Sequence, residues 1–316
     1  MPMRTGSAPL VKVIGAESLG VRGLCTALDL PGSRIVIDPG VSLGYRRSGL
    51  LPHPVQVAIG RQVREQIVQA LETATDVVIS HFHGDHIPLA DANPYQLSLR
   101  DLPAKFPALR CWSKSTEGLP GPFARRYKDL KALLGGNLQI AEGRTEGLLS
   151  FSDPVPHGAA DSGMGSLMMT RVELPGGVFV HASDIQLLDD DTVQRILDWQ
   201  PDIVLAAGPP LYLRRLDQAA LETAWNNALR LARSIGCLIL DHHLTRSRAG
   251  ADWLKALSRA AGRQVWCAAD YMQRPRQLLE AERARLYARF PVPAGWHQAY
   301  AEGRADPTPW LEDWLS

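Results

Sequence analysis

The residues of this chain best suited to chemistry are the six from 81 to 86, which read His-Phe-His-Gly-Asp-His. Imidazole binds zinc, iron and manganese, and a carboxylate adds charge that suits a second divalent ion. Side chains alternate along an extended segment, so His81 and His83 are expected to point the same way and reach one metal. The glycine lets the backbone bend, after which Asp85 and His86 can reach a second metal. A solvated histidine-rich loop is the alternative, but the cluster directly follows an apolar run, which favours a metal centre.

Further candidate ligands lie far along the chain, each beside a predicted strand. His157 precedes a predicted hairpin, and Asp184 follows the second strand of that hairpin. His242 and His243 follow a late apolar run. Taken alone, each would be assigned to a loop or to the core. Because sites in α/β proteins gather where strands end, these positions together with the cluster predict a site for two metals.

The elements expected to position these residues alternate between strands and helices. Apolar runs predict strands, apolar spacing of three and four residues predicts helices, and the proline-rich segment 88–144 predicts loops with short helices. The predicted strands are 10–14, 34–37, 76–80, 167–174, 178–182, 202–206, 237–240 and 265–268, and the predicted helices are 58–73, 193–199, 219–234, 251–261 and 277–287. An antiparallel hairpin among these alternating elements predicts an α/β fold with a mixed sheet.

Composition excludes several classes of protein. The 34 Lys and Arg nearly balance the 33 Asp and Glu, and a net charge of +1 argues against binding nucleic acid through an overall basic field. No apolar run approaches the roughly twenty residues of a membrane span and no signal peptide is recognised, so we expect a cytoplasmic protein without a membrane partner. The four cysteines are widely spaced, which predicts buried thiols. No linker divides the chain, and we expect one domain over residues 1–316.

The order of these motifs resembles the metallo-β-lactamase superfamily. His-x-His-x-Asp-His is followed by a lone histidine, an aspartate after a strand and a late histidine, and Asp38 resembles the early aspartate of that superfamily. A closer resemblance, to an uncharacterised branch of predicted metal-dependent hydrolases common in archaea, covers nearly the whole chain. It rests on the segments 17–22, 37–41, 49–54 and 241–244.

The resemblance implies an αββα four-layer sandwich, with two mixed β-sheets flanked by helices and the metals at one edge. It assigns His81, His83 and His157 to a first metal. Asp85, His86 and His242 would hold a second metal, with His243 as the alternative to His242, and Asp184 would bridge the two. Asp38 and Asp241 are expected behind the ligands, since ligating imidazoles usually donate their second N–H to a carboxylate or carbonyl.

The expected function is that of a metal-dependent hydrolase with two divalent ions, zinc first and iron or manganese as alternatives. A hydroxide shared by the metals would attack an ester, lactone, thioester or phosphoester of a small substrate. Asp85 and Asp184 are the expected catalytic carboxylates, and His53 and His243 are candidates for the substrate pocket. The alternatives are a nuclease or phosphodiesterase, iron-dependent redox or oxygen chemistry, and a metal-stabilised scaffold.

The expected partner is a small-molecule substrate rather than a nucleic acid, and the sequence leaves homo-oligomer formation open. Two locally basic regions, 246–263 and 274–289, could bind phosphates, but solvated helix faces are the favoured interpretation.

Overall fold

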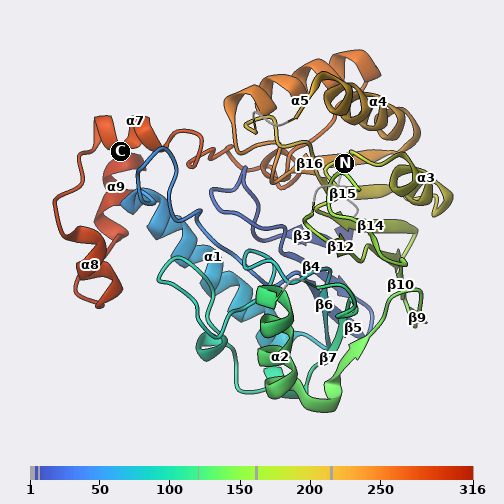
Figure 1. The fold of residues 1–316 in the computed structure, drawn as a ribbon, viewed down its shortest axis with the longest axis horizontal. Helices are drawn as coiled ribbons and strands as arrows, with labels where there is room; N and C mark the ends of the chain where they lie inside the picture. The colour runs from blue at the N-terminus through green and yellow to red at the C-terminus, as the bar shows by residue number, and fades with distance from the viewer. Residues whose placement is uncertain (1–3, 6–7, 120, 161–162, 214–215, 316) are drawn as a thin grey trace.

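A computed structural model describes residues 4–5, 8–119, 121–160, 163–213 and 216–315 of the chain. Two six-stranded sheets dominate it (Figure 1). In the first sheet the two leading strand pairs are antiparallel and the later pairs are parallel. Its strands, in spatial order, are β3 (Val11–Val13), β4 (Thr26–Leu30), β5 (Ser33–Ile37), β6 (Asp76–Ile79), β7 (Arg110–Ser113) and β8 (Leu138–Ile140).

The second sheet is also mixed. It contains the predicted hairpin, whose two strands pair antiparallel from Thr170↔His181 to Leu174↔Gly177, followed by two parallel neighbours. Its strands, in spatial order, are β16 (Cys237–Asp241), β15 (Ile203–Ala207), β14 (Gly177–Ser183), β13 (Thr170–Leu174), β10 (Leu149–Phe151) and β9 (Thr145–Glu146). Two short pairs lie outside it: β1 (Arg4–Thr5) with β2 (Ala8–Pro9), and β11 (Val155–Pro156) with β12 (Ser166–Leu167).

Alternating side chains on the strands build the layers. Val77 of β6 packs with Ile67 and Leu71 of the helix α1 (Pro54–Thr73), whereas the next residue, Val78, packs in the cluster that contains Val172 of the second sheet. The helices α1 and α2 (Gly121–Leu134) cover the outer face of the first sheet (Figure 1). The helices α3 (Asp190–Asp198), α4 (Gln218–Ser234) and α5 (Arg248–Ala261) cover the second sheet. The predicted αββα sandwich is therefore confirmed.

Two regions differ from the sequence-based prediction. The segment 88–144 contains the strands β7 and β8 and the fourteen-residue helix α2, beside the 3-10 turns η1 (Leu99–Asp101), η2 (Phe106–Ala108) and η3 (Gly135–Asn137). The predicted strand at 265–268 forms only an isolated bridge between Trp266 and Ile239, because α6 (Ala268–Tyr271) begins there. Prolines misled the first prediction: Pro94 and Pro103 lie between elements, and Pro107 and Pro122 lie in the first turn of η2 and α2, where a helix tolerates proline.

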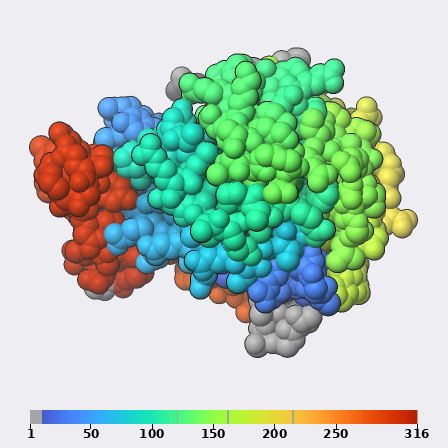
Figure 2. Space-filling model, turned by 90° about the horizontal axis from the view of Figure 1, so that it is seen from below, coloured from blue at the N-terminus to red at the C-terminus, as the bar shows by residue number. Residues whose placement is uncertain are grey.

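The C-terminal segment packs beside α1 and projects at one end of the molecule (Figures 1 and 2). The single helix predicted at 277–287 is wrong, since three helices follow instead: α7 (Arg283–Arg289), α8 (Trp296–Ala301) and α9 (Thr308–Leu315). Trp310 and Trp314 pack against the cluster under α1. All four cysteines are buried free thiols, as predicted. No helix in the described part of the chain is long and apolar enough to cross a membrane.

Candidate metal centre

The predicted ligands follow strands that end at one edge of the sandwich. Three strand ends beside the ligands carry a non-glycine residue in the left-handed region: Asp38 after β5 (φ 50°), Ser183 at the end of β14 (φ 50°) and His242 after β16 (φ 55°). This conformation costs roughly 1–2 kcal/mol for an L-residue. Such strain persists where the surroundings fix the backbone, and it concentrates at functional sites.

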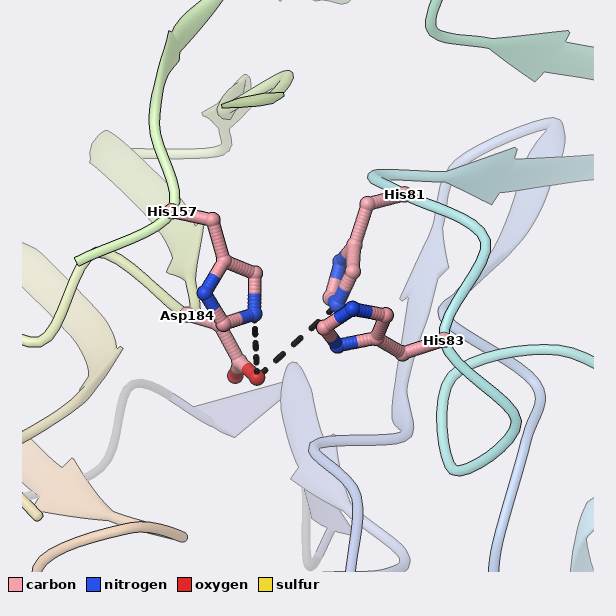
Figure 3. Close-up of side chains that lie close together, drawn as sticks. All are labelled: His81, His83, His157 and Asp184. Atoms are coloured by element: carbon pink, nitrogen blue, oxygen red, sulfur yellow. Dashed lines mark ion pairs between the residues drawn. The ribbon is translucent and has the colours of Figure 1, made fainter. Parts of the chain in front are cut away.

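One group of donors brings together four predicted ligands from three elements (Figure 3). His81 and His83 follow β6, His157 follows β11, and Asp184 follows β14. One ligand atom from each lies within 4.8 Å of the others. Asp184 Oδ2 is 3.3 Å from His157 Nε2 and 3.8 Å from His81 Nε2. Three imidazoles and a carboxylate are a donor set that suits zinc, iron or manganese.

A second group lies against the same carboxylate. Asp85, His86 and His242 offer ligand atoms within 4.8 Å of one another. Asp184 Oδ2 is 3.4 Å from His86 Nε2 and 3.5 Å from His242 Nε2, and Asp85 Oδ2 is 3.5 Å from His242 Nε2. One oxygen of Asp184 therefore faces imidazoles of both groups.

Asp38 supports both groups from behind. His86 Nδ1 lies 2.8 Å from Asp38 Oδ2 and donates to it. The hydroxyl of Ser80 donates to the same oxygen at 2.6 Å, so it can accept from His81 Nδ1, which is 2.9 Å away. In its neutral form each ring then carries its proton on Nδ1, which leaves Nε2 free to bind a metal, as hydrogen bonds to an outer carboxylate do for metal-bound histidines. The expected supporting role of Asp38 agrees with this geometry.

Unpartnered buried atoms test whether a metal fits. His81 Nε2, His86 Nε2 and Asp184 Oδ1 are buried and have no hydrogen-bond partner among the residues that the structure describes. A buried polar atom without a partner costs about 1–3 kcal/mol, and such atoms are rare in native proteins. All three atoms belong to the two ligand groups, and each is of a type that binds divalent cations. The residues present fit a metal centre.

The protonation states also suit metal binding. Burial and the neighbouring His157 lower the pKa of His83 to about 3, and burial and His86 lower the pKa of His81 well below its ordinary value, so both rings are neutral. Burial alone would raise the pKa of Asp184, but the surrounding histidines outweigh it and keep this pKa well below its ordinary value. Burial likewise opposes the charge of His86, yet Asp184 and Asp38 raise the pKa of His86 well above its ordinary value.

His242 and His243 differ in surroundings. His242 belongs to the group of Asp85 and His86, but the backbone N–H of Gly23 donates to its Nδ1 at 3.2 Å, which in a neutral ring leaves the proton on Nε2. His243 Nδ1 lies 3.0 Å from the hydroxyl of Tyr212, and its Nε2 lies 3.1 Å from Asp184 Oδ2. Membership of the second group favours His242 as the ligand, and the Asp184 carboxylate, which can only accept, places the proton of a neutral His243 on Nε2 as well.

Two predicted site residues make hydrogen bonds that differ from those their predicted roles require. The pocket assignment of His53 is wrong: the side chain is fully buried, accepts from Val55 N as the N-cap of α1, and contacts the carbonyl of Phe290. Asp241 supports the backbone rather than an imidazole, because it accepts from the amides of His242, Ser18 and Ala268. An N-cap histidine and an amide-binding aspartate give no sequence pattern that separates them from site residues.

Sequence analysis missed a second layer around the site. Ser80 and Ser183 bond to Asp38, Gln186 contacts His157 Nδ1 at 3.4 Å, and Tyr212 contacts His243. The two serines directly precede ligands, which is the signal that could have found them.

Arg246 requires a correction as well. Region 246–263 is expected to be a solvated helix face, but Arg246 is not part of one. It lies before α5, is buried, and bonds to Glu17 and to the Tyr212 hydroxyl at 3.0 Å each. Its Nη2 is 3.3 Å from both ring nitrogens of His242. Its position four residues after His242 was an available signal.

Known proteins place the chain in a family. No family model matches it. A UPF0282 protein of Methanosarcina mazei is 47% identical over 305 residues, covering 96% of this chain and 99% of the relative. The chain therefore belongs to the UPF0282 family. A UPF0282 protein of Methanopyrus kandleri is 34% identical over 285 residues, covering 86% of this chain and 97% of the relative.

Among solved structures, this UPF0282 protein is similar to a metal-dependent hydrolase of the β-lactamase superfamily. The two are 12% identical, the match covers 81% of this chain and 94% of the other, and the TM-score is 0.48. The sheet order, the two helical layers and the order of the ligand motifs give the UPF0282 chain the metallo-β-lactamase fold.

Proposed function

We propose that the protein is a metal-dependent hydrolase with a dinuclear centre, most simply of zinc, that acts on a small substrate. The observation that carries this proposal is the position of Asp184 Oδ2, which lies 3.3 Å from His157 Nε2 in the first group and 3.4 Å from His86 Nε2 in the second. A carboxylate oxygen that faces two sets of metal-binding side chains is suited to bridging two cations.

The chain's own residues divide the tasks between them. His81, His83 and His157 would hold the first ion, Asp85, His86 and His242 the second, and Asp184 would contact both. Two divalent ions there would lower the pKa of a bound water and polarise the carbonyl or phosphoryl oxygen of an ester, lactone, thioester or phosphoester. No serine or cysteine nucleophile is then required.

Asp85 is the ligand best placed to meet substrate and water. Its side chain is 19% exposed, whereas those of His86 and His242 are fully buried. The neighbouring histidines and Arg246 outweigh the effect of burial and lower the pKa of Asp85, so it is ionised at neutral pH. An ionised, partly exposed carboxylate can orient the attacking water and accept its proton.

A hydrolysis panel tests the function. Lactones, thioesters, carboxylic esters and phosphodiesters are supplied to the purified protein, and we expect turnover of at least one class. Asp85→Asn should lower kcat by about 10²–10⁴-fold. Asp91→Asn is the matched control, since Asp91 is exposed and pairs only with Arg125 among the ion pairs of the described residues. Absence of turnover for every class, or equal activity of the two variants, contradicts the proposal.

A further inference from the structure

A polar cavity of about 220 Å³ opens beside the candidate metal centre. Asp85 and Gly84 of the ligand loop form part of its wall, so whatever fills the cavity lies next to the second group of ligands. Its other polar lining residues come from four separate segments of the chain: Arg22, then Ser42 and Tyr45, then Asn93, Tyr95 and Gln96, and finally Arg126.

Arg22 is fixed to the second ligand group through its neighbour Gly23. The Gly23 amide donates to His242, and a Cβ added at Gly23 would lie only 2.5 Å from the carbonyl oxygen of Asp85. The Arg22 side chain donates from Nε and Nη2 to Glu280, at 2.6 Å each. Its Nη1 has no hydrogen-bond partner among the described residues and can donate to a ligand.

Arg126 reaches the cavity from α2. Its Nη1 donates to the carbonyl of Phe82 at 2.9 Å, and its Nη2 is 3.6 Å from the position of a Cβ built on Gly84. The guanidinium therefore lies against the ligand loop itself. The nearby carboxylate of Asp91 is paired with Arg125, and no ion pair in the described residues takes up the charge of Arg126.

The wall behind Arg22 holds more positive than negative charge. Glu280 lies 2.6 Å from Arg22 and 3.5 Å from Arg47, and Glu17 lies 3.0 Å from Arg246. Arg283, also buried, donates to backbone carbonyls and to Gln56 rather than to a carboxylate. Four guanidinium groups thus surround two carboxylates. Burial and the nearby Glu280 raise the pKa of Glu17 to about 8, which enlarges the positive excess at neutral pH.

We infer that this cavity binds an anionic group of the substrate, a phosphate or a carboxylate, through Arg22 and Arg126. The inference rests on the proposed hydrolase function and gives its substrate class: a small anion whose charged group occupies the cavity while the scissile bond lies toward Asp85. A guanidinium presents planar paired donors that match the oxygens of both anions. Two guanidinium groups and one carboxylate, that of Asp85, line the recess, so its charged lining is net positive and attracts an anion.

Binding measured without turnover tests this inference separately from the hydrolase function. Inorganic phosphate and succinate are titrated calorimetrically into the purified protein as isolated and into Arg126→Gln, Arg126→Lys, Arg125→Gln and His83→Asn variants, each checked for folding by circular dichroism. Arg125→Gln is the matched control, because it removes the same charge one residue away from an exposed side chain.

We expect at least one probe to bind and Arg126→Gln to weaken it about tenfold or more, the size of one lost charge-assisted hydrogen bond. Arg126→Lys should lie between that variant and the wild type, and Arg125→Gln should bind as the wild type does. Failure of both probes to bind overturns the inference. Equal binding by Arg126→Gln and Arg125→Gln also overturns it, as does binding that is lost in His83→Asn but kept in Arg126→Gln.

A negative hydrolysis panel combined with Arg126-dependent anion binding would refute the hydrolase function and leave the anion site standing. Turnover of neutral substrates only, with no anion binding, would refute the anion site and leave the hydrolase function standing.

Discussion

The carboxylate of Asp38 accepts a 2.8 Å hydrogen bond from Nδ1 of His86, 48 residues further along the chain. Through Ser80 the same carboxylate also acts on His81, so one buried group sets the tautomer of a histidine in each ligand group. The burial of Asp38 would raise its pKa, but the hydrogen bond from His86 and the charge of that ring outweigh burial and lower it. The ionised form that these contacts require is therefore the stable one.

Asp38→Asn should weaken the second metal by about 10–100-fold, the usual effect of removing an outer partner of a ligating histidine. An amide cannot accept every bond that the carboxylate does, and His86 loses the partner that keeps its proton on Nδ1. Competitive metal titration measures the change. Asp29→Asn, on an exposed residue of β4, is the control. Equal metal affinity in the two variants would show that Asp38 does not support the metal ligands.

The two adjacent histidines are separable by substitution. His242→Asn, which tolerates the positive φ of this position, should reduce the bound metal from two equivalents to about one. His243→Asn should retain both and change only the polar contacts to Asp184 and Tyr212. Elemental analysis of the two purified variants gives the answer. The opposite pattern would assign the ligand role to His243, whose Nε2 lies 3.1 Å from Asp184 Oδ2.

Metal binding should be coupled to the release of a proton from His86. Burial opposes the charge of His86, but Asp184 and Asp38 outweigh it and raise the pKa of His86, so the metal-free ring is protonated at pH 7. The pKa of His83 is about 3, so that ring is already neutral. Binding the second metal should therefore release about one proton from His86, and its affinity should rise with pH until the pH passes the His86 pKa.

Calorimetric titration of the metal-free protein with zinc, in buffers of different ionisation enthalpy, counts these protons. His86→Gln should lower the proton count by about one. Proton-free binding of both metals by the wild type would show that His86 is neutral in the metal-free protein.

Close backbone packing makes Gly40 a sensitive position. A Cβ there would lie 2.1 Å from Ile87 N and 2.2 Å from His86 C, both backbone atoms that cannot move aside cheaply. Gly40→Ala should lower the free energy of unfolding by about 1–3 kcal/mol and weaken the second metal. Gly136→Ala, which meets no atom within 4 Å, should change stability by less than about 0.5 kcal/mol. Denaturant unfolding compares them, and similar losses would contradict the packing argument.

Much of the fold was predictable because the relevant signals are local. The apolar run before His81 became β6, the hairpin before Asp184 became β13 and β14, and the helix predicted at 219–234 became α4 (Gln218–Ser234). Each depends on side-chain periodicity within one element. The C-terminal helices were not predictable in this way, because their burial comes from packing against α1, far away in the sequence.

The candidate site shows the same division. Ligand types and strand ends are local, and the structure brings all the predicted ligands into two adjoining groups. The roles of His53 and Arg246 depend on Phe290 and Glu17, each more than 200 residues distant. No spacing within the chain encodes such contacts, which arise only when the sandwich closes.

Metal content tests the central claim most directly. The purified wild-type protein and an Asp184→Asn variant are analysed for metals by mass spectrometry after gel filtration, with thermal unfolding followed before and after chelation. We predict about two divalent ions per wild-type chain, a substantial loss of both in Asp184→Asn, and a lower Tm after chelation. A wild-type protein that retains no metal, gains none on incubation with zinc, iron or manganese, and unfolds at the same temperature with and without chelator would contradict the account.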